Sequence, residues 1–324
     1  MLHIGVLIYP GAQMAAVLGM TDLFRVAGDI AARRHDQDVR PLMVSHWRAA
    51  TPGQGPECVF ASGGDEGRPP DVCILPPSLE GPPVQDDPAT TDWLLSQHQR
   101  GATLASVCTG AFVLGATGLL AGRSVTTHWT YEAAFGARFP EARVNTDRLI
   151  LDEDDIITAG GLMAWTDLAL ALIDRHLGAE VMIEAARTFL LDPPGREQSF
   201  YSGFSPRLDH QDPAVLKVQH WLSDTETKTV DVATLAAQAG LEERTFLRRF
   251  HKATGMTSTE YWQRLRVARA RNLLQEGLLS TDQVAWDVGY SDPSAFRRVF
   301  NRVVGLTPAE YRNRFRGRGG RDDI

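Results

Sequence analysis

One helical unit occurs twice in the last third of this 324-residue chain. The run LAAQAGLEERTFLRRFHKATGMTSTEY, from Leu235, aligns with VAWDVGYSDPSAFRRVFNRVVGLTPAEY, from Val284. A glycine matches at an offset of 49 residues, and the phenylalanines, a second glycine and a tyrosine match at 50, so the second copy has one extra residue in its turn. Because a repeat of this length is one supersecondary unit, the pattern predicts two copies of the same helical structure.

Each copy contains a short helix, a glycine that permits a tight turn, and a second helix whose two phenylalanines, four residues apart, face inward. This is helix-turn-helix geometry, in which the second helix offers its outer face to the major groove of DNA. Asp231 or Asp282 is expected to cap the first helices, and Thr307 with Pro308 to begin the last one. The run STEYWQRLRVARARNLLQEG predicts one connecting helix that separates the second helices by about one turn of DNA, ~34 Å.

The charge of the chain is divided unevenly. Residues 1–211 carry a formal charge of -11 and residues 212–324 carry +4, within a total of -7. Residues 244–316 alone hold 14 Lys and Arg against 6 Asp and Glu. An arginine on a helix is most often only solvated. The conjunction of repeat, glycine turn, aromatic spacing and local positive charge nevertheless favours a polyanionic partner, double-stranded DNA.

The repeat resembles the AraC/XylS family of transcriptional regulators over roughly Asp212 to Phe315. The resemblance implies DNA contacts from both second helices, by Arg244, Thr245, Arg248, Ser294, Arg297 and Arg298. Leu247 and Pro293 stand where the family often has polar base contacts. Here they can offer only apolar contacts, for instance to a thymine methyl group.

The first part of the chain alternates strand patterns with helical patterns, which predicts a mostly parallel sheet wrapped by helices. Strands are expected over 3–9, 39–47, 71–76, 103–107, 148–152 and 155–160, and helices over 15–28, 90–100, 129–139, 162–178 and 179–191. The composition, 43% hydrophobic and 23% charged, is typical of globular proteins and excludes a disordered or collagen-like chain.

Composition also limits the cofactors and the compartment. Three widely spaced cysteines give neither a disulfide framework nor a zinc knuckle, so no metal and no cofactor are expected. The apolar start lacks a signal-peptide pattern, and no run reaches the ~18 apolar residues of a membrane span. We therefore expect a soluble, cytoplasmic protein without a membrane partner.

The run TLASVCTGAFVLGATGLL places Cys108 where a strand ends and a small-residue helix begins. A thiol on such a turn is exposed, and a helix N-terminus favours the thiolate, so Cys108 is a candidate nucleophile with His128 as its base. A lone cysteine is more often a small buried hydrophobe, and a lone histidine a satisfied core or surface residue. The strand-to-turn context favours the functional interpretation modestly.

The segment SVCTGAFVLGATGLLAGRSVTTHW resembles the PfpI-like branch of the class I glutamine amidotransferase-like fold, and best those members that carry an AraC-type tail, often called GlxA-type regulators. The resemblance covers about residues 1–191 and implies a flavodoxin-like sandwich. Two residues depart from the enzymes of that fold: Ala16 replaces a carboxylate near the cysteine, and Pro77, which has no N–H group, stands in the loop that commonly supplies an oxyanion donor. Losing one such donor typically lowers a rate by ~10²–10³, so we expect no catalytic residues and no enzyme.

The expected organisation is therefore an α/β domain over 1–191, a linker over 192–212, an all-α domain with two helix-turn-helix motifs over 213–316, and a disordered tail over 317–324. The first domain is expected to bind a small carboxylate or polar metabolite in a pocket lined by Cys108, Thr109, His128, Trp129 and Ser78. Trp129 and Trp165 have even odds of being core aromatics instead. The family implies a homodimer, and RNA polymerase is a further candidate partner.

The expected function is a metabolite-responsive transcriptional regulator, taken here as an activator. The alternative from another class is a cysteine-dependent hydrolase or hydratase whose tail localises it on DNA. A thiol redox sensor is a third interpretation; it has the least support, because no second cysteine is evidently placed to resolve a sulfenic acid.

Overall fold

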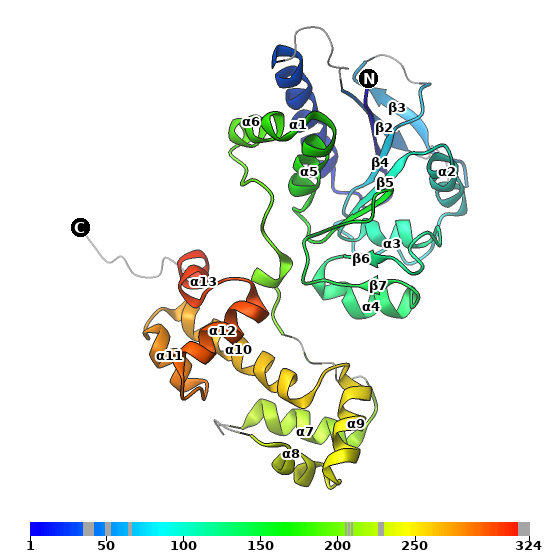
Figure 1. Cartoon of the computed structure of the whole chain (residues 1–324). Helices are drawn as coiled ribbons and strands as arrows, with labels where there is room; N and C mark the ends of the chain where they lie inside the picture. Colours follow the sequence, from blue (N-terminus) through cyan, green and yellow to red (C-terminus); the bar gives the residue numbers. More distant parts are fainter. Residues whose placement is uncertain are drawn as a thin grey trace, which may run out of the picture. The chain divides into compact units, whose positions relative to one another are not determined.

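The computed structural model describes residues 1–34, 42–48, 53–63, 67–204, 206, 208, 210–225 and 230–316. Contacts divide the chain into two compact units, Met1–Gln198 and Ser199–Ile324 (Figure 1). The tail over 317–324 lies outside the described residues. Among the residues described, no helix is both long and apolar enough to cross a membrane.

The first unit is built on one sheet, which has seven strands in the described part of the chain, in the order β3-β2-β1-β4-β5-β9-β8. Its strands are β1 (His3–Ile8), β2 (Met43–Arg48), β3 (Glu57–Ala61), β4 (Val72–Leu75), β5 (Thr103–Val107), β8 (Ile150–Asp152) and β9 (Ile156–Ala159). The inner strands pair in parallel, and the edge strands β3 and β8 pair antiparallel. A mostly parallel α/β sheet is therefore confirmed.

Helices cover both faces of this sheet (Figure 1). Successive strand residues point to opposite faces, so Ile74 packs with one apolar cluster, while Cys73 and Leu75 pack with another. The first cluster is covered by α1 (Met14–Arg34), α5 (Trp165–Leu177) and α6 (Ala179–Phe189). The second is covered by α2 (Pro88–Gln99), α3 (Gly110–Gly115), the short turn η1 (Trp129–Tyr131) and α4 (Glu132–Arg138). Two short strands, β6 (Ser124–Val125) and β7 (Arg143–Val144), pair separately.

Several element boundaries differ from those expected. Helix α1 does not end at Gly28 but continues to Arg34, because Ile30 and Ala31 beyond it are buried in the core. Helix α3 stops at Gly115, before the small-residue run ends at Leu120. The sequence analysis also missed β3, β6 and β7; β6 and β7 are only two residues long, and β3 is an edge strand with little buried surface to impose a period.

The second unit is helical in its described residues. Its helices are α7 (Pro213–Asp224), α8 (Val232–Ala239), α9 (Glu243–Thr254), α10 (Ser258–Glu276), α11 (Thr281–Asp287), α12 (Pro293–Val304) and α13 (Pro308–Phe315), and the short turn η2 (Gln198–Phe200) lies at the boundary between the units. Gly240 and Gly289, at the turns of the two motifs, have φ of 67° and 85°. The left-handed conformation explains why glycine occupies both turns.

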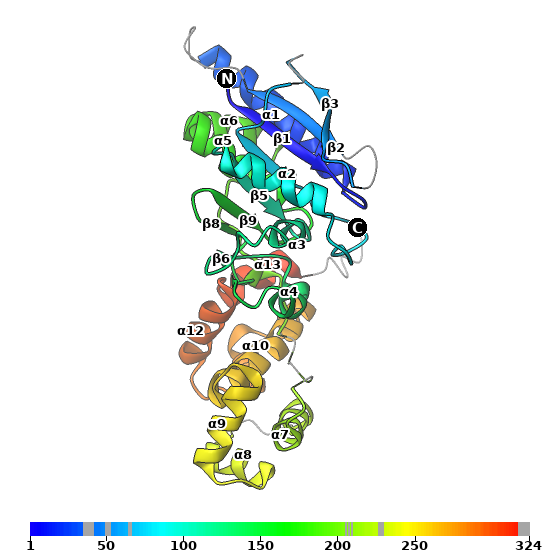
Figure 2. The ribbon, with the colours of Figure 1, turned by 90° about the vertical axis from the view of Figure 1, so that its right-hand side faces the viewer.

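Each motif has its own apolar core, and α10 belongs to both. Phe246 and Phe250 of α9 are fully buried in one cluster with Tyr261 of α10, and the matching phenylalanines of α12 are fully buried in another with Val267 of α10. Figure 2 shows α10 between α9 and α12. The predictions of inward phenylalanines and of one long connecting helix are therefore confirmed.

The helix caps agree with expectation at two of three places. Asp231 caps α8 and accepts a hydrogen bond from the Thr234 N–H at 2.8 Å. Thr307 caps α13 in a reciprocal box with Glu310. Asp282 does not cap α11: Ser280 does, because it precedes the first helical residue. Asp282 instead lies in the first turn and forms an ion pair with Arg297.

Candidate functional site

Three loops of the first unit meet at the carboxyl ends of neighbouring strands. The chain leaves β1 at Tyr9, β4 at Pro76 and β5 at Cys108. The order of strands reverses direction between β1 and β4, and ligands of open α/β sheets bind at such a switch point. The sheet topology therefore brings three of the predicted site residues, Ser78, Cys108 and Thr109, to the same edge.

The loops after β1 and β4 are tied to each other. Ala12 and Ser78 form an antiparallel bridge, and the Gln13 N–H donates to the Pro77 carbonyl at 2.7 Å. Gly11 has a φ of 76°, and a β-carbon there would lie 2.5 Å from the Ser78 hydroxyl. Glycine is therefore required at this crossing by both conformation and space.

Cys108 occupies a sharp turn between β5 and α3. Its φ is 54°, which is uncommon for a residue other than glycine, and its residue exposure is only 2%. The turn is held by the Cys108 N–H, which donates to the Ala159 carbonyl at 2.7 Å, and by the Thr127 hydroxyl, which donates to the Cys108 carbonyl at 2.7 Å. The next turn packs so closely that a β-carbon at Gly110 would lie 2.4 Å from the Leu75 carbonyl oxygen.

The Cys108 thiol differs from the expected reactive thiolate. Burial raises its pKa to about 11, although backbone N–H groups of Thr109, Gly161 and His128 lower it in part. Burial therefore outweighs the helix N-terminus on which the expectation of a thiolate rested, and the thiol is protonated near neutral pH.

His128 lies beside Cys108 through its backbone, and its ring contacts Thr130 and Trp129. Its Nδ1 lies 2.7 Å from the Thr130 hydroxyl and accepts a hydrogen bond from the Thr130 N–H at 3.2 Å. The ring stacks on Trp129, with centroids 5.5 Å apart. Burial lowers the pKa of His128, so the imidazole is neutral at physiological pH. Trp129 is half-buried on this stack.

Ser78 and Thr109 are joined directly: the Ser78 N–H donates to the Thr109 hydroxyl oxygen at 2.7 Å. That N–H is the backbone donor next to Pro77, in the loop for which the sequence resemblance implies an oxyanion donor, and it is already engaged. Ala16 is fully buried in the same apolar cluster as Cys108, so this position offers no acidic group to the thiol.

Two residues near the site were missed by the sequence analysis. The Tyr9 hydroxyl donates to the Pro76 carbonyl, and burial raises the pKa of Tyr9. Gln13 is 8% exposed, and its side-chain oxygen accepts no hydrogen bond from the described residues. The only signal in the sequence was their place directly after the first strand. Trp165, for which the sequence left a role in the core open, packs on the core cluster that contains Cys108.

A short segment runs from this site toward the second unit. Gln198 is buried; its side-chain N–H groups donate to the Thr126 hydroxyl at 2.9 Å and to the carbonyls of Thr127 at 2.8 Å and Arg148 at 3.0 Å. Its side-chain oxygen accepts the Trp129 N–H at 3.2 Å. Gln198 thus holds the loop that carries His128 and Trp129.

The residues that follow are held by the second unit. The Arg271 guanidinium donates to the Ser199 carbonyl at 2.6 Å and to the Ser202 carbonyl, and Arg314 donates to the Tyr201 hydroxyl at 3.0 Å. Gln198 and Ser199 are adjacent, so the hydrogen bonds of the two units meet at one peptide bond.

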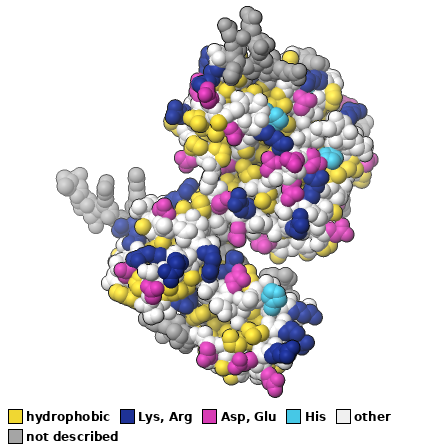
Figure 3. Space-filling model, in the orientation of Figure 1, with side chains coloured by type: hydrophobic (Ala, Val, Ile, Leu, Met, Phe, Trp, Pro, Cys, Tyr) yellow, Lys and Arg dark blue, Asp and Glu magenta, His cyan; other side chains and the backbone are white. Residues whose placement is uncertain are grey.

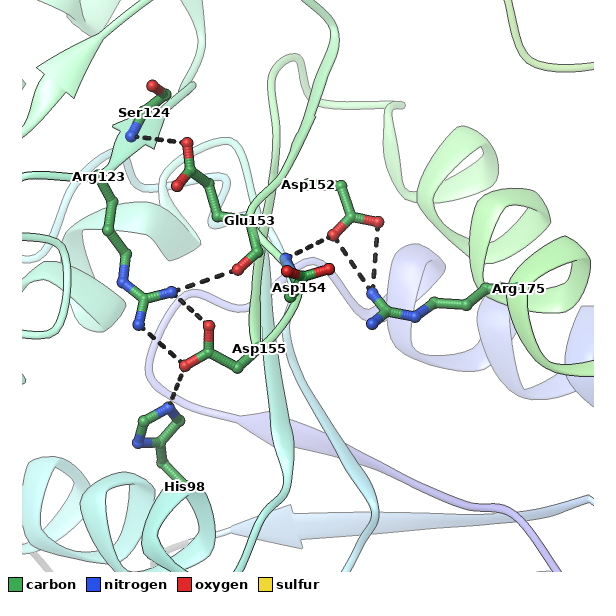
Figure 4. Close-up of polar contacts among 8 residues, drawn as sticks. All are labelled: His98, Arg123, Ser124, Asp152, Glu153, Asp154, Asp155 and Arg175. Atoms are coloured by element: carbon green, nitrogen blue, oxygen red, sulfur yellow. Dashed lines mark hydrogen bonds and ion pairs between the residues drawn. The ribbon is translucent and has the colours of Figure 1, made fainter.

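A separate polar cluster surrounds the turn between β8 and β9. Figure 4 shows its members, His98, Arg123, Ser124, Asp152, Glu153, Asp154, Asp155 and Arg175. Asp155 accepts from Arg123 at 2.9 Å and lies 2.7 Å from His98, and Arg175 contacts Asp152 at 3.2 Å. These pairs offset part of the negative charge of the acidic turn and tie the turn to α2, β6 and α5. In the described part of the chain, no group of three or more His, Cys, Asp or Glu is arranged to hold a metal ion.

The predicted DNA-contacting residues of the second unit lie on α9 and α12. Arg244 and Arg248 are exposed on α9, and Thr245 is half-buried. On α12, Ser294 is exposed, and the Arg298 side chain is 72% exposed. Figure 3 shows Lys and Arg side chains gathered over α9 and over α12 on the same face of this unit.

Other arginines of the second unit serve its structure. Arg249 forms an ion pair with Asp212, the cap of α7, at 2.7 Å. On α10, Arg266 donates to the Val288 carbonyl and lies over the Tyr290 ring, and Arg269 donates to the Leu222 carbonyl at 2.9 Å. Arg266 and Arg269 therefore join α10 to neighbouring segments of the second unit.

Comparisons with known proteins agree with this architecture. Residues 235–314 match a helix-turn-helix domain family, and residues 68–175 match the DJ-1/PfpI family. The HTH-type transcriptional regulator GlxA of Rhizobium meliloti (strain 1021) is 30% identical over 234 residues, which cover 71% of each chain. The isonitrile hydratase of Pseudomonas putida is 31% identical over 180 residues, 55% of this chain and 74% of that one. A crystal structure of the AdpA DNA-binding domain with target DNA is 36% identical, covers 32% of this chain and 92% of that chain, and has a TM-score of 0.30.

Proposed function

The chain belongs to the AraC-type transcriptional regulators that carry a DJ-1/PfpI domain, and from this premise we propose that its second unit binds double-stranded DNA under the control of a small molecule bound by its first unit. One observation carries the DNA proposal. In both motifs the second helix buries its phenylalanines completely and leaves arginines on its outer face. A helix of this kind fits the major groove and can meet bases or phosphates there.

The proposed contacts come from both second helices: Arg244, Thr245, Arg248, Ser294, Arg297 and Arg298. Arginine donates bidentately to guanine and also binds phosphate, so these side chains can supply both base readout and general affinity. Because α10 joins the two motif cores, we propose that α9 and α12 enter successive major grooves on one side of the duplex, about one turn apart.

The proposed effector site lies at the carboxyl ends of β1, β4 and β5 and is lined by Cys108, Thr109, His128, Trp129 and Ser78. The protonated thiol and the neutral imidazole favour a neutral polar group or a small carboxylate over a reacting substrate. The buried Gln13 oxygen can accept a hydrogen bond from the effector. An aromatic face such as that of Trp129 also suits a cationic group.

We propose that this site binds and does not catalyse. The Cys108 thiol is protonated, Ala16 supplies no acid, and the Ser78 N–H is engaged by Thr109. The similarity to an isonitrile hydratase favours the second candidate function, a cysteine-dependent hydratase or hydrolase. Intact mass spectrometry after incubation with iodoacetamide and candidate amides or isonitriles separates the two: rapid, selective alkylation of Cys108 together with turnover supports the enzyme.

Regulation is proposed to act as a population shift, because an effector can change DNA binding only if it prefers one conformation. The route is the segment on either side of the Gln198–Ser199 bond, which we take as part of a linker over 192–212 between domains 1–191 and 213–316. The wider proposal is a homodimer formed through the first domain, acting in the cytoplasm as an activator that engages RNA polymerase.

A salt titration tests the DNA proposal. The affinity for duplex DNA, measured by fluorescence anisotropy, should fall steeply with salt, with log K decreasing by about 0.9 per phosphate contact for each unit of log salt concentration. Arg298→Ala should weaken specific binding by about 1–3 kcal/mol if Arg298 reads a base, and weaken all duplexes alike if it touches only phosphate. An affinity that neither salt nor Arg298→Ala changes contradicts the proposal.

A further inference from the structure

The two motifs can be compared position by position, because their caps fix the alignment. Asp231 and Ser280 cap the first helices, and Glu242 and Asp292 precede the second ones. With this register, Asp282 of α11 corresponds to Ala233 of α8, and Arg297 of α12 corresponds to Leu247 of α9. At these two places the first motif is apolar and the second is charged.

The two charged residues contact each other. Arg297 donates through Nη2 to the Asp282 carboxylate, and the two side chains are 48% and 47% exposed. In the first motif the corresponding Leu247 is 40% exposed on the outer face of α9. The ion pair therefore lies on the face that the proposed function assigns to DNA.

Stability alone gives little reason for this pair. An exposed ion pair typically contributes ~0.2–1 kcal/mol. A free arginine on a surface samples many rotamers, and its entropy must be lost when it binds a base. A guanidinium has five N–H donors, so one contact with Asp282 restricts Arg297 and leaves donors for a further partner.

We propose that Asp282 is a positioning residue, which holds Arg297 for a bidentate contact with guanine, so that the second motif reads a guanine where the first motif offers Leu247 to an apolar group such as a thymine methyl. This inference rests on the proposed DNA-binding function. The two halves of the target site would then be read by different chemistry, although the motifs are copies of one fold. The acceptors O6 and N7 of guanine match the fork of a guanidinium, and the thymine methyl matches leucine.

A purely structural role for Asp282 predicts something different. A carboxylate in the first turn of α11 stabilises that helix through its dipole. Its loss would then lower the thermal stability of the second unit and leave base preference unchanged. Asp287 provides a matched control, because it carries the same charge at the other end of the same helix and is exposed.

The experiment uses the full chain. Duplexes are selected from a random library with the unmodified protein, and their affinities, and those of single-base variants, are measured by anisotropy. We expect a guanine at one position of one half-site, whose replacement weakens binding about 10-fold or more. Asp282→Ala should reduce that discrimination at least threefold at this position alone and should not weaken binding to random duplexes. Arg297→Lys should remove most of the guanine discrimination, and Asp287→Ala should leave the guanine discrimination unchanged.

A gain-of-function variant keeps the inference testable if Asp282→Ala fails to fold. Transplanting the pair into the first motif, as Ala233→Asp with Leu247→Arg, should create a guanine preference in the other half-site that Leu247→Arg alone creates less well. Unchanged guanine discrimination in a folded Asp282→Ala protein, or no new preference in the transplant, overturns the inference. If the unmodified protein selects no sequence and its binding ignores salt, the proposed function fails instead.

Discussion

At the scale of single residues, the chemistry of the first unit is decided by burial and by hydrogen bonds that are already made. Cys108 sits on the turn expected from the sequence, yet its thiol is protonated because the site is enclosed. His128 lies next to it, yet its Nδ1 faces Thr130. The same residue types that suit a nucleophile and a base thus form, in this surrounding, a site suited to binding.

The raised pKa of Cys108 predicts how its alkylation depends on pH. With a pKa of about 11, about one thiol in a thousand is ionised at pH 8, and the thiolate is the nucleophile. The iodoacetamide rate at Cys108, followed by peptide mass spectrometry, should therefore rise about 10-fold per pH unit up to at least pH 10. The half-buried Cys58 provides the internal comparison. A rate that reaches a plateau near pH 7 would show an activated thiolate.

At the scale of elements, polar pairs fix turns, and α10 fixes the motifs. Asp155 joins Arg123 and His98, so the hairpin of β8 and β9 is tied to the neighbouring β6 and α2. In the second unit, the first turns of α10 pack in one phenylalanine cluster, and its later turns pack in the other. Neither connection is a local property of the elements that it joins.

The Asp155 pairs predict an acid-sensitive hairpin. Arg123, and to a lesser extent His98, hold the pKa of Asp155 well below its usual value. A depressed carboxyl pKa stabilises the folded state above the unfolded pKa of about 3.9, and this contribution is lost as pH falls below that value. Because the Asp155 side chain is 42% exposed, Asp155→Asn should cost about 1 kcal/mol at pH 7.

That cost corresponds to roughly fivefold faster hydrogen exchange of the β9 amides, which mass spectrometry can measure. The difference in opening free energy between the Asp155→Asn and unmodified proteins should be smaller near pH 3 than at pH 7. Asp152→Asn, which removes the more exposed pair with Arg175, is the control and should have a smaller effect. Equal exchange in the Asp155→Asn and unmodified proteins at pH 7 would show that the pair does not hold the hairpin.

The role of α10 predicts the result of inserting one alanine after Leu265, between the parts of the helix that serve the two cores. One residue turns an α-helix by about 100° and lengthens it by 1.5 Å, so α12 would no longer face the same side of a duplex as α9. Specific affinity should fall at least 10-fold, while binding to random duplexes at low salt persists. An alanine inserted after Gly53, in an exposed stretch of the first unit, should leave both affinities unchanged.

At the scale of the whole molecule, the boundary between the two units falls at the Gln198–Ser199 bond. Gln198 belongs to the hydrogen bonds of the first unit, and Ser199 belongs to those of the second. Coupling between two binding sites is reciprocal. If an effector changes the affinity for DNA, bound DNA must therefore change the effector site.

Gln198→Ala should remove this coupling. In the unmodified protein, a bound duplex should change the hydrogen exchange of the peptide around residues 126–131 by at least twofold. In the variant, exchange should be faster throughout, because the buried carbonyls of Thr127 and Arg148 lose their donor, and the DNA-dependent change should vanish. Gln97→Ala, which alters a buried glutamine of α2, is the control. A DNA-dependent change that survives in Gln198→Ala would place the coupling elsewhere.

The sequence by itself determined the class of the molecule, because the signals are local and periodic. Alternating strand and helix patterns indicated the parallel sheet, the duplicated spacing of glycine and phenylalanine indicated two helix-turn-helix motifs, and the run from Ser258 indicated α10. Edge strand β3 and the end of α1 were not predicted, because their structure depends on neighbouring elements rather than on a periodic pattern of their own residues.

Only the tertiary structure decided what the site residues are free to do. The thiol pKa of Cys108 depends on its enclosure, and the engagement of the Ser78 N–H depends on Thr109, 31 residues away. The pairing of Asp282 with Arg297 and the hold of Gln198 on the loop before Trp129 are likewise contacts across the fold. Burial and hydrogen-bond partners arise from long-range packing, and no local spacing in a chain specifies them.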